Sequence, residues 1–153
     1  MTRILFVCMG NICRSPTVEA VARIELARAG LEIEVGSAGT EGYHIGDRAD
    51  ARAIAMAEAH GYPLQAHRAR QVVDADFERF DHLLVMDHVN LRALLGRTPA
   101  LARERVALFL PFAGLTDVEE LPDPYYGTEA DFGIALDLSR RGVAALARRL
   151  SGS

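Results

Sequence analysis

Residues 4–16 read Ile4-Leu5-Phe6-Val7-Cys8-Met9-Gly10-Asn11-Ile12-Cys13-Arg14-Ser15-Pro16, and the prediction of the fold begins with this stretch. The run from Ile4 to Val7 is short and wholly apolar, which is typical of a buried strand. Pro16 suits the first turn of a helix, for which Ser15 is the expected N-cap. A strand that leads through a short loop into a helix is the repeating unit of parallel sheets.

The same alternation of apolar runs and helical periods continues to the end of the chain. Further strands are expected at 31–36, 83–86 and 106–110, further helices at 50–60, at about 88–95 and from an N-cap at Thr128 to Leu150, and a glycine-rich loop at 37–46. No repeat or linker interrupts this pattern. We therefore predict a single α/β domain over residues 1–153, with a parallel sheet flanked by helices on both faces.

The composition disfavours several classes of function. The net charge is −4 and the basic residues are scattered, so we expect no broad basic face for nucleic acid. The apolar run at residues 4–7 is too short for a signal peptide or a membrane span. The two cysteines lie close together instead of forming a spread disulfide framework. These features predict a cytoplasmic protein that binds neither nucleic acid nor membranes.

The loop after the first strand is the expected ligand site, because open parallel sheets bind ligands at the carboxyl ends of their strands. Backbone N–H groups at a helix N-terminus point into one concavity, which suits a phosphate. Gly10 leaves room for the turn, Asn11 tolerates a positive φ, and Arg14 offers a planar fork for two phosphate oxygens. The residues expected to hold the phosphate are Met9, Gly10, Asn11, Ile12, Cys13, Arg14 and Ser15.

Cys8 stands at the mouth of this loop. The positive potential there favours a thiolate, which would lie under a bound phosphate in line for attack on phosphorus. The hydroxyl of Ser15 could donate to the sulfur and make it a better leaving group. Taken alone, Cys8 could equally be a buried structural cysteine. Its separation from Arg14 by five residues, with a strand before it and Ser-Pro after it, favours a nucleophile.

The segment from Val7 to Pro16 resembles the phosphate loop of the low-molecular-weight protein-tyrosine phosphatases, and Asp123-Pro124-Tyr125-Tyr126-Gly127 is similar to the acid loop of that family. Further matches follow the family's order through nearly the whole chain: Ser37-Ala38-Gly39-Thr40, His67-Arg68-Ala69-Arg70 and Met86-Asp87 with Asn90. The resemblance implies a four-stranded parallel sheet in a flavodoxin-like phosphatase fold. It also implies hydrolysis of protein phosphotyrosine and aryl phosphates through a cysteinyl-phosphate, without a metal or cofactor.

Asp123 is the expected general acid. A tyrosine leaving group has a pKa of about 10, so it is expelled slowly unless it is protonated. Pro122 and Pro124 stiffen the loop that carries this carboxyl group. Close to the phosphate it would stay protonated for the first step and act as a base toward water in the second. Without the Cys8 loop, an aspartate between two prolines would be interpreted as a turn residue.

The resemblance also implies residues around the phosphate. Tyr43 and Tyr125 would form aromatic walls for the phosphotyrosine ring, at a depth that shorter phosphoserine would not use; ordinary loop packing is the alternative. Asp87 is expected to cap its helix and to contact the catalytic loop. The residues implied to support the two loops are Asn11, Ser37, His67 and Tyr126.

Cys13 has three interpretations: loop packing, a metal ligand, or a partner that captures oxidised Cys8 in a disulfide. Metal binding is the weakest, because no two further ligands with zinc spacing are found. A tyrosine kinase acting on Tyr125 or Tyr126 is the one partner considered besides the phosphotyrosine-containing substrate proteins.

Three rival functions share part of this pattern. A thiol-coupled arsenate reductase has a similar loop but needs additional cysteines, and none follows Cys13. A phosphoarginine phosphatase family places threonine where this chain has Ile12. A non-catalytic module would bind a phosphoprotein and release it unchanged, which the joint presence of Cys8 and Asp123 disfavours.

Overall fold

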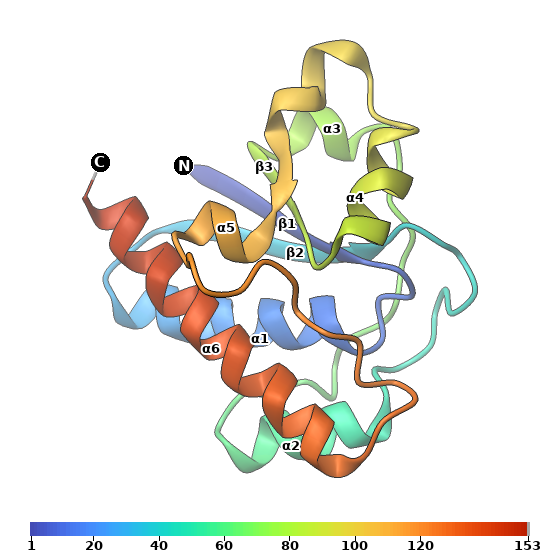
Figure 1. Ribbon diagram of the computed structural model, residues 1–153, viewed down its shortest axis with the longest axis vertical. Helices are drawn as coiled ribbons and strands as arrows, with labels where there is room; N and C mark the ends of the chain where they lie inside the picture. The colour runs from blue at the N-terminus through green and yellow to red at the C-terminus, as the bar shows by residue number, and fades with distance from the viewer. Residues whose placement is uncertain (153) are drawn as a thin grey trace.

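A computed structural model of the chain describes residues 1–152. Four strands form one parallel sheet in the order β2-β1-β3-β4 (Figure 1). Their bounds are β1 Thr2–Cys8, β2 Ile33–Gly39, β3 His82–Val85 and β4 Val106–Leu108. The prediction of a four-stranded parallel sheet is confirmed. Because β1 pairs with β2 on one side and with β3 on the other, its carboxyl end is the topological switch point of the sheet.

Helices connect the strands and follow the last of them. They are α1 Arg14–Arg28, α2 Ala51–Ala59, α3 Asp76–Arg79, α4 His88–Leu95, the 3-10 helix η1 Ala100–Arg105, α5 Phe109–Ala113 and α6 Glu129–Ser151. Asp87 caps α4 by accepting from the backbone N–H of Asn90, and Thr128 occupies the N-cap position of α6, as predicted. No helix within residues 1–152 is long and apolar enough to cross a membrane.

Successive residues of β1 point into two separate cores, as the two-residue period of a strand requires. Ile4, Phe6 and Cys8 belong to the core that also contains side chains of α1, α2, α5 and α6. Leu5 and Val7 belong to a second core, formed with side chains of α3, α4 and η1. Helices therefore cover both faces of the sheet, and α1, α2 and α6 lie together on one side (Figure 1).

Some expected boundaries were wrong. Ser15 lies inside α1, whose N-cap is Cys13, because the Ser15 hydroxyl contacts Cys8 and Asn11 instead of capping the helix. β2 begins and ends later than expected, since its pairing with β1 continues as far as Gly39. The strand expected at 106–110 stops after three residues, and the chain turns into α5. A short buried apolar run fits a strand or a helix equally well.

Candidate active site

The loop after β1 turns sharply at Asn11. Within residues 1–152, Asn11 is the one residue other than glycine with a positive φ, at 58°. Asn11 therefore adopts the positive φ that it was expected to tolerate. Left-handed backbone costs a residue with a side chain about 1–2 kcal/mol, so the surrounding contacts must hold Asn11 in place.

Four hydrogen bonds to the side chain and carbonyl of Asn11 hold it in this conformation. Its Nδ2 donates to Ser15 Oγ at 2.8 Å and to Ser37 Oγ at 3.0 Å. Its Oδ1 accepts from the backbone N–H of Arg70 at 3.0 Å, and its carbonyl accepts from His67 Nε2 at 2.8 Å. Asn11, Ser37 and His67 therefore form the connected network that the resemblance implied, and His67 braces backbone from outside the pocket.

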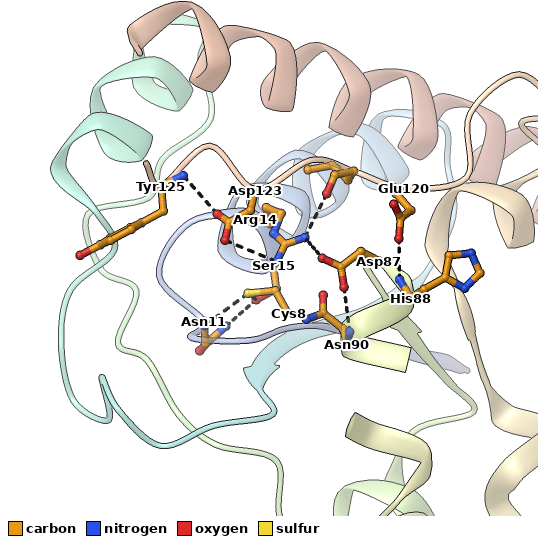
Figure 2. Close-up of polar contacts among 11 residues, drawn as sticks. Cys8, Asn11, Arg14, Ser15, Asp87, His88, Asn90, Glu120, Asp123 and Tyr125 are labelled. Atoms are coloured by element: carbon orange, nitrogen blue, oxygen red, sulfur yellow. Dashed lines mark hydrogen bonds and ion pairs between the residues drawn. The ribbon is translucent and has the colours of Figure 1, made fainter. Parts of the chain in front are cut away.

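Cys8 lies at the base of the loop and is only 3% exposed. The backbone N–H of Asn11 donates to its Sγ at 3.3 Å, and Ser15 Oγ lies 3.0 Å from the same sulfur (Figure 2). Ser15 Oγ accepts from Asn11, and its one hydroxyl proton has two acceptors within reach, the sulfur at 3.0 Å and the carbonyl of Ala38 at 3.5 Å, of which the sulfur is nearer. Two donors aimed at one sulfur stabilise negative charge on it.

Arg14 is held at the start of α1 with its side chain 4% exposed. Its Nη1 donates to Asp87 Oδ2 at 2.7 Å and to the carbonyl of Leu121 at 3.0 Å. The other oxygen of Asp87 accepts from the backbone N–H of Asn90 at the start of α4 (Figure 2). The helix cap therefore also sets the orientation of the guanidinium group, and the predicted contact of Asp87 with the loop is confirmed.

Asp123 is brought to the site from far along the chain. Its Oδ2 lies 3.8 Å from Nη2 of Arg14, and its Oδ1 accepts from the backbone N–H of Tyr125 at 3.1 Å. Just before it, the N–H of Leu121 donates to the carbonyl of Met86 at 2.9 Å, beside the end of β3. That hydrogen bond anchors the chain at Leu121, just before the loop that carries Asp123 across the mouth of the site.

These residues surround a cavity of about 220 Å³. It is lined by Cys8, Met9, Gly10, Ile12, Cys13, Arg14, Tyr43, His44, Asp123, Tyr125 and Tyr126. Tyr43 is 73% exposed and Tyr125 is 37% exposed, so both rings stand at the rim and not in a core. The rings of Tyr125 and Tyr126 meet edge to face at a centroid distance of 4.9 Å.

A family model described as "Low molecular weight phosphotyrosine protein phosphatase" matches residues 3–153. The chain belongs to this family. As a member of it, the protein is a protein-tyrosine phosphatase, an enzyme that hydrolyses phosphoric monoesters. The expected resemblance is confirmed.

Relatives and solved structures agree with this assignment. The chain is 40% identical to low molecular weight phosphotyrosine protein phosphatases of Schizosaccharomyces pombe and Homo sapiens, covering 86% and 84% of the chain and 85% and 83% of the relatives. A crystal structure of a protein tyrosine phosphatase from Entamoeba histolytica, with Hepes in its active site, is 35% identical with a TM-score of 0.93. That match covers 99% of this chain and 98% of the other. A low molecular weight phosphotyrosine phosphatase from Vibrio cholerae is 34% identical with a TM-score of 0.92, covering 99% of this chain and 97% of the other.

Cys13 in this phosphatase is a buried thiol on the wall of the pocket. Burial is the main cause that raises its pKa far above the usual value, with the nearby carboxylate of Asp50 adding to the effect. Both Cys8 and Cys13 are free thiols. Among the residues that the structure describes, no three His, Cys, Asp or Glu side chains are grouped to hold a metal ion.

Two residues near the site of this phosphatase were missed by the sequence analysis. His44 lines the pocket and lies over Gly10, where an added Cβ would come within 3.1 Å of the imidazole Cδ2. Arg52 contacts the loop that carries Asp123. The position of His44 beside Tyr43 in a glycine-rich loop could have suggested the first residue. Nothing in the local pattern around Arg52 indicates the second.

Proposed function

We propose that this phosphatase hydrolyses phosphotyrosine in proteins, with Cys8 as nucleophile, Arg14 as the phosphate-binding cation and Asp123 as general acid and base. The observation that carries the assignment is the position of the sulfur. Cys8 Sγ receives the N–H of Asn11 and the hydroxyl of Ser15 at the floor of a pocket that Arg14 and Asp123 also line. A thiolate, a guanidinium and a carboxyl group around one cavity are the groups that phosphoryl transfer from an aryl ester requires.

In the first step, Cys8 Sγ attacks phosphorus while the bond from phosphorus to the phenolic oxygen breaks. Backbone N–H groups of residues 9–14 and the guanidinium of Arg14 stabilise the charge on the three equatorial oxygens. Asp123 gives its proton to the departing phenolate, so tyrosine leaves neutral and a cysteinyl-phosphate remains. The ion pair of Arg14 with Asp87 keeps the guanidinium fixed throughout.

In the second step, water attacks the cysteinyl-phosphate and the bond from sulfur to phosphorus breaks. Asp123, now a carboxylate, takes the proton from water. The sulfur leaves as a thiolate, which accepts again from the hydroxyl of Ser15 and the N–H of Asn11. Inorganic phosphate leaves the pocket and the starting enzyme is restored.

The rim of the pocket supports an aromatic substrate. We assign Tyr43 and Tyr125 as walls for the phosphotyrosine ring and Tyr126 as the support of Tyr125 through its edge-to-face contact. Met9, Gly10, Ile12, Cys13 and His44 supply the rest of the lining. Ile12 offers no polar group to a guanidine, so phosphoarginine is the less favoured substrate.

The same proposal includes the setting of the enzyme. The free thiols of Cys8 and Cys13 fit a reducing cytoplasm, because a thiolate nucleophile is lost on oxidation. Tyr126 is 94% exposed and therefore accessible to a tyrosine kinase. We assign Tyr125 and Tyr126 as candidate sites of phosphorylation by such a kinase. We treat residues 1–153 as one phosphatase domain.

Phosphate release from a phosphotyrosine peptide and from phenyl phosphate, in excess chelator, tests the proposal. Turnover by the wild-type protein that is lost in Cys8→Ser supports the enzyme, whereas binding without turnover supports a phosphate-binding module. Acid quench during turnover, followed by mass measurement, should locate the phosphoryl group on Cys8. An adduct on another side chain, or faster turnover of phosphoarginine than of phosphotyrosine, would overturn the assignment.

A further inference from the structure

Arg52 lies in the first turn of α2, outside the pocket lining, and is held in a fixed orientation by Asp50. Its Nε donates to Asp50 Oδ1 at 3.1 Å and its Nη2 donates to Asp50 Oδ2 at 2.9 Å. Asp50 is also the N-cap of α2, since its Oδ1 accepts from the backbone N–H of Arg52 at 2.8 Å. The hydrogen bonds from Arg52 are the main cause that lowers the pKa of Asp50, so the pair is ionised at neutral pH. A bidentate ion pair of this kind restricts rotation of the guanidinium plane.

The Nη2 group that donates to Asp50 also contacts the loop that carries Asp123. Nη2 of Arg52 donates to the backbone carbonyl of Tyr125 at 3.0 Å. The central carbon of the guanidinium lies 5.6 Å from the centroid of the Tyr125 ring and 4.5 Å from that of the Phe132 ring. Phe132 belongs to the first turns of α6, which packs against α2 (Figure 1). Arg52, whose side chain is 44% exposed, therefore contacts both the acid loop and the helix that follows it.

Asp50 joins this arrangement to the phosphate loop. Its backbone N–H donates to the carbonyl of Ile12 at 2.8 Å. A continuous path of hydrogen bonds thus runs from Ile12 through Asp50 and Arg52 to Tyr125. Its two ends lie on the loops that carry Cys8 and Asp123.

Few other hydrogen bonds or ion pairs attach the acid loop to the rest of the described residues. Among the described residues, side chains from elsewhere in the chain form hydrogen bonds or ion pairs with residues 122–127 at two points. One is the 3.8 Å contact of Arg14 with Asp123, and the other is the bond from Arg52 to Tyr125. Prolines at 122 and 124 stiffen the loop without attaching it to the phosphate loop.

We propose that Arg52 is a positioning residue for this phosphatase: through Tyr125 it holds the loop of Asp123 at the distance from the phosphate loop that proton transfer to the leaving group requires. The proposal rests on the assignment of Asp123 as general acid. A displacement of about 1 Å between reacting groups can lower a rate by about 100-fold, so a contact that fixes this distance affects turnover without touching substrate. Its loss should affect leaving groups in proportion to their need for a proton.

The test compares Arg52→Ala with the wild-type protein on two substrates. Phenyl phosphate has a basic leaving group that needs protonation, and p-nitrophenyl phosphate has one that leaves readily without it. We expect kcat/KM, which reports formation of the cysteinyl-phosphate and not its hydrolysis, to fall by between about 10- and 100-fold for phenyl phosphate and by less than about threefold for p-nitrophenyl phosphate. Arg141→Ala is the control, because Arg141 also pairs with an aspartate, its Nη2 donating to both oxygens of Asp117, and neither residue lines the pocket. It should match the wild-type protein on both substrates.

A double variant decides whether the effect passes through Asp123. In an Asp123→Ala background, Arg52→Ala should lower kcat/KM for phenyl phosphate by less than about twofold, because the proton donor it positions is gone. An undiminished loss in that background would overturn the proposal. So would equal losses of kcat/KM on the two substrates, which would make Arg52 a support for the aromatic wall alone.

Arg52→Lys keeps the charge and one donor but loses the fork and the flat stacking surface. We expect it to recover only part of the phenyl phosphate turnover, and full recovery would contradict positioning by the paired geometry. Thermal unfolding of each variant identifies any that fail to fold, and the lysine variant keeps the test valid if alanine is not tolerated. If Asp123→Ala lowers turnover of phenyl phosphate and of p-nitrophenyl phosphate equally, the proposed role of Asp123 as general acid fails. If Asp123→Ala lowers turnover of phenyl phosphate more, but Arg52→Ala behaves like Arg141→Ala, only the positioning role of Arg52 fails.

Discussion

Asp87 Oδ2 lies 2.7 Å from Nη1 of Arg14, while the second oxygen of the same carboxylate accepts from the backbone N–H of Asn90 and caps α4. One side chain thus caps the start of a helix and orients the guanidinium of Arg14. These two roles can be separated. A serine hydroxyl at position 87 can cap the helix, but it carries no charge and is too short to hold the guanidinium of Arg14.

We predict that Asp87→Ser and Asp87→Ala lower kcat/KM to a similar extent but differ in stability. Both variants remove the partner of the buried Arg14 guanidinium, whereas only alanine also removes the cap. The free energy of unfolding of the alanine variant should be lower than that of the serine variant by about 1 kcal/mol. Urea unfolding and steady-state kinetics measure the two effects. Equal stability of the variants would show that the cap does not contribute.

The second prediction concerns Asp123. Asp123→Ala should lower kcat/KM, which reports the first step, for phenyl phosphate by about 100- to 10,000-fold, the usual contribution of a general acid. The loss for p-nitrophenyl phosphate should be much smaller, because its leaving group departs without a proton. Equal losses for both substrates would exclude Asp123 as the acid.

The third prediction concerns the positive φ of Asn11. Asn11→Gly removes the side-chain hydrogen bonds with Ser15, Ser37 and Arg70 but accepts a φ of 58° without strain. Asn11→Ala removes the same bonds and adds about 1–2 kcal/mol of backbone strain. We expect alanine to lower the free energy of unfolding more than glycine does, by about that amount. An alanine variant as stable as the glycine variant would mean that the loop relaxes out of the left-handed conformation.

The fourth prediction concerns pH and His82, at the start of β3. Burial is the main cause that lowers the pKa of His82 below its usual value of 6.5, although Asp81 opposes the shift. Because the unfolded chain binds this proton more readily, the contribution of His82 to stability is present above pH 6.5 and is lost as the pH falls through the folded-state pKa. Urea unfolding of the wild-type protein between about pH 7.5 and 5.5 should show this decline.

His82→Asn is the control for that experiment. It also loses the ring contact with Phe112, whose centroid lies 4.7 Å away, but that loss does not depend on pH. The wild-type and variant curves should therefore approach one another as the pH is lowered. Parallel curves over this range would assign the decline to other groups.

Local signals in the chain were enough to predict much of the fold. The apolar run at residues 4–7 predicted β1, and the caps at Asp87 and Thr128 predicted where α4 and α6 begin. These signals work because a strand period or a helix cap depends on residues only a few positions apart. The parallel sheet followed from the alternation of such elements.

Elements without a local signal were not predicted or were misplaced. The apolar residues 109–113 form α5 because they pack against α6 in the core, and their sequence alone does not distinguish a helix from a strand. Ser15 resembles a helix cap, but its hydroxyl is used by Cys8 and Asn11. α3 and η1 are too short to show a period.

The site divides in the same way. The amino acids themselves determined that a phosphate loop follows the first strand. The local signals are the spacing of Cys8 from Arg14 and the positive φ available to Asn11. The order of strands in the sheet decided that Asp87 and Asp123 reach Arg14, and the packing of α2 against α6 decided that Arg52 reaches Tyr125. The physical reason is range: backbone dihedral preferences and caps act between neighbours in the chain, whereas a contact between distant residues exists only after burial of both cores brings their elements together.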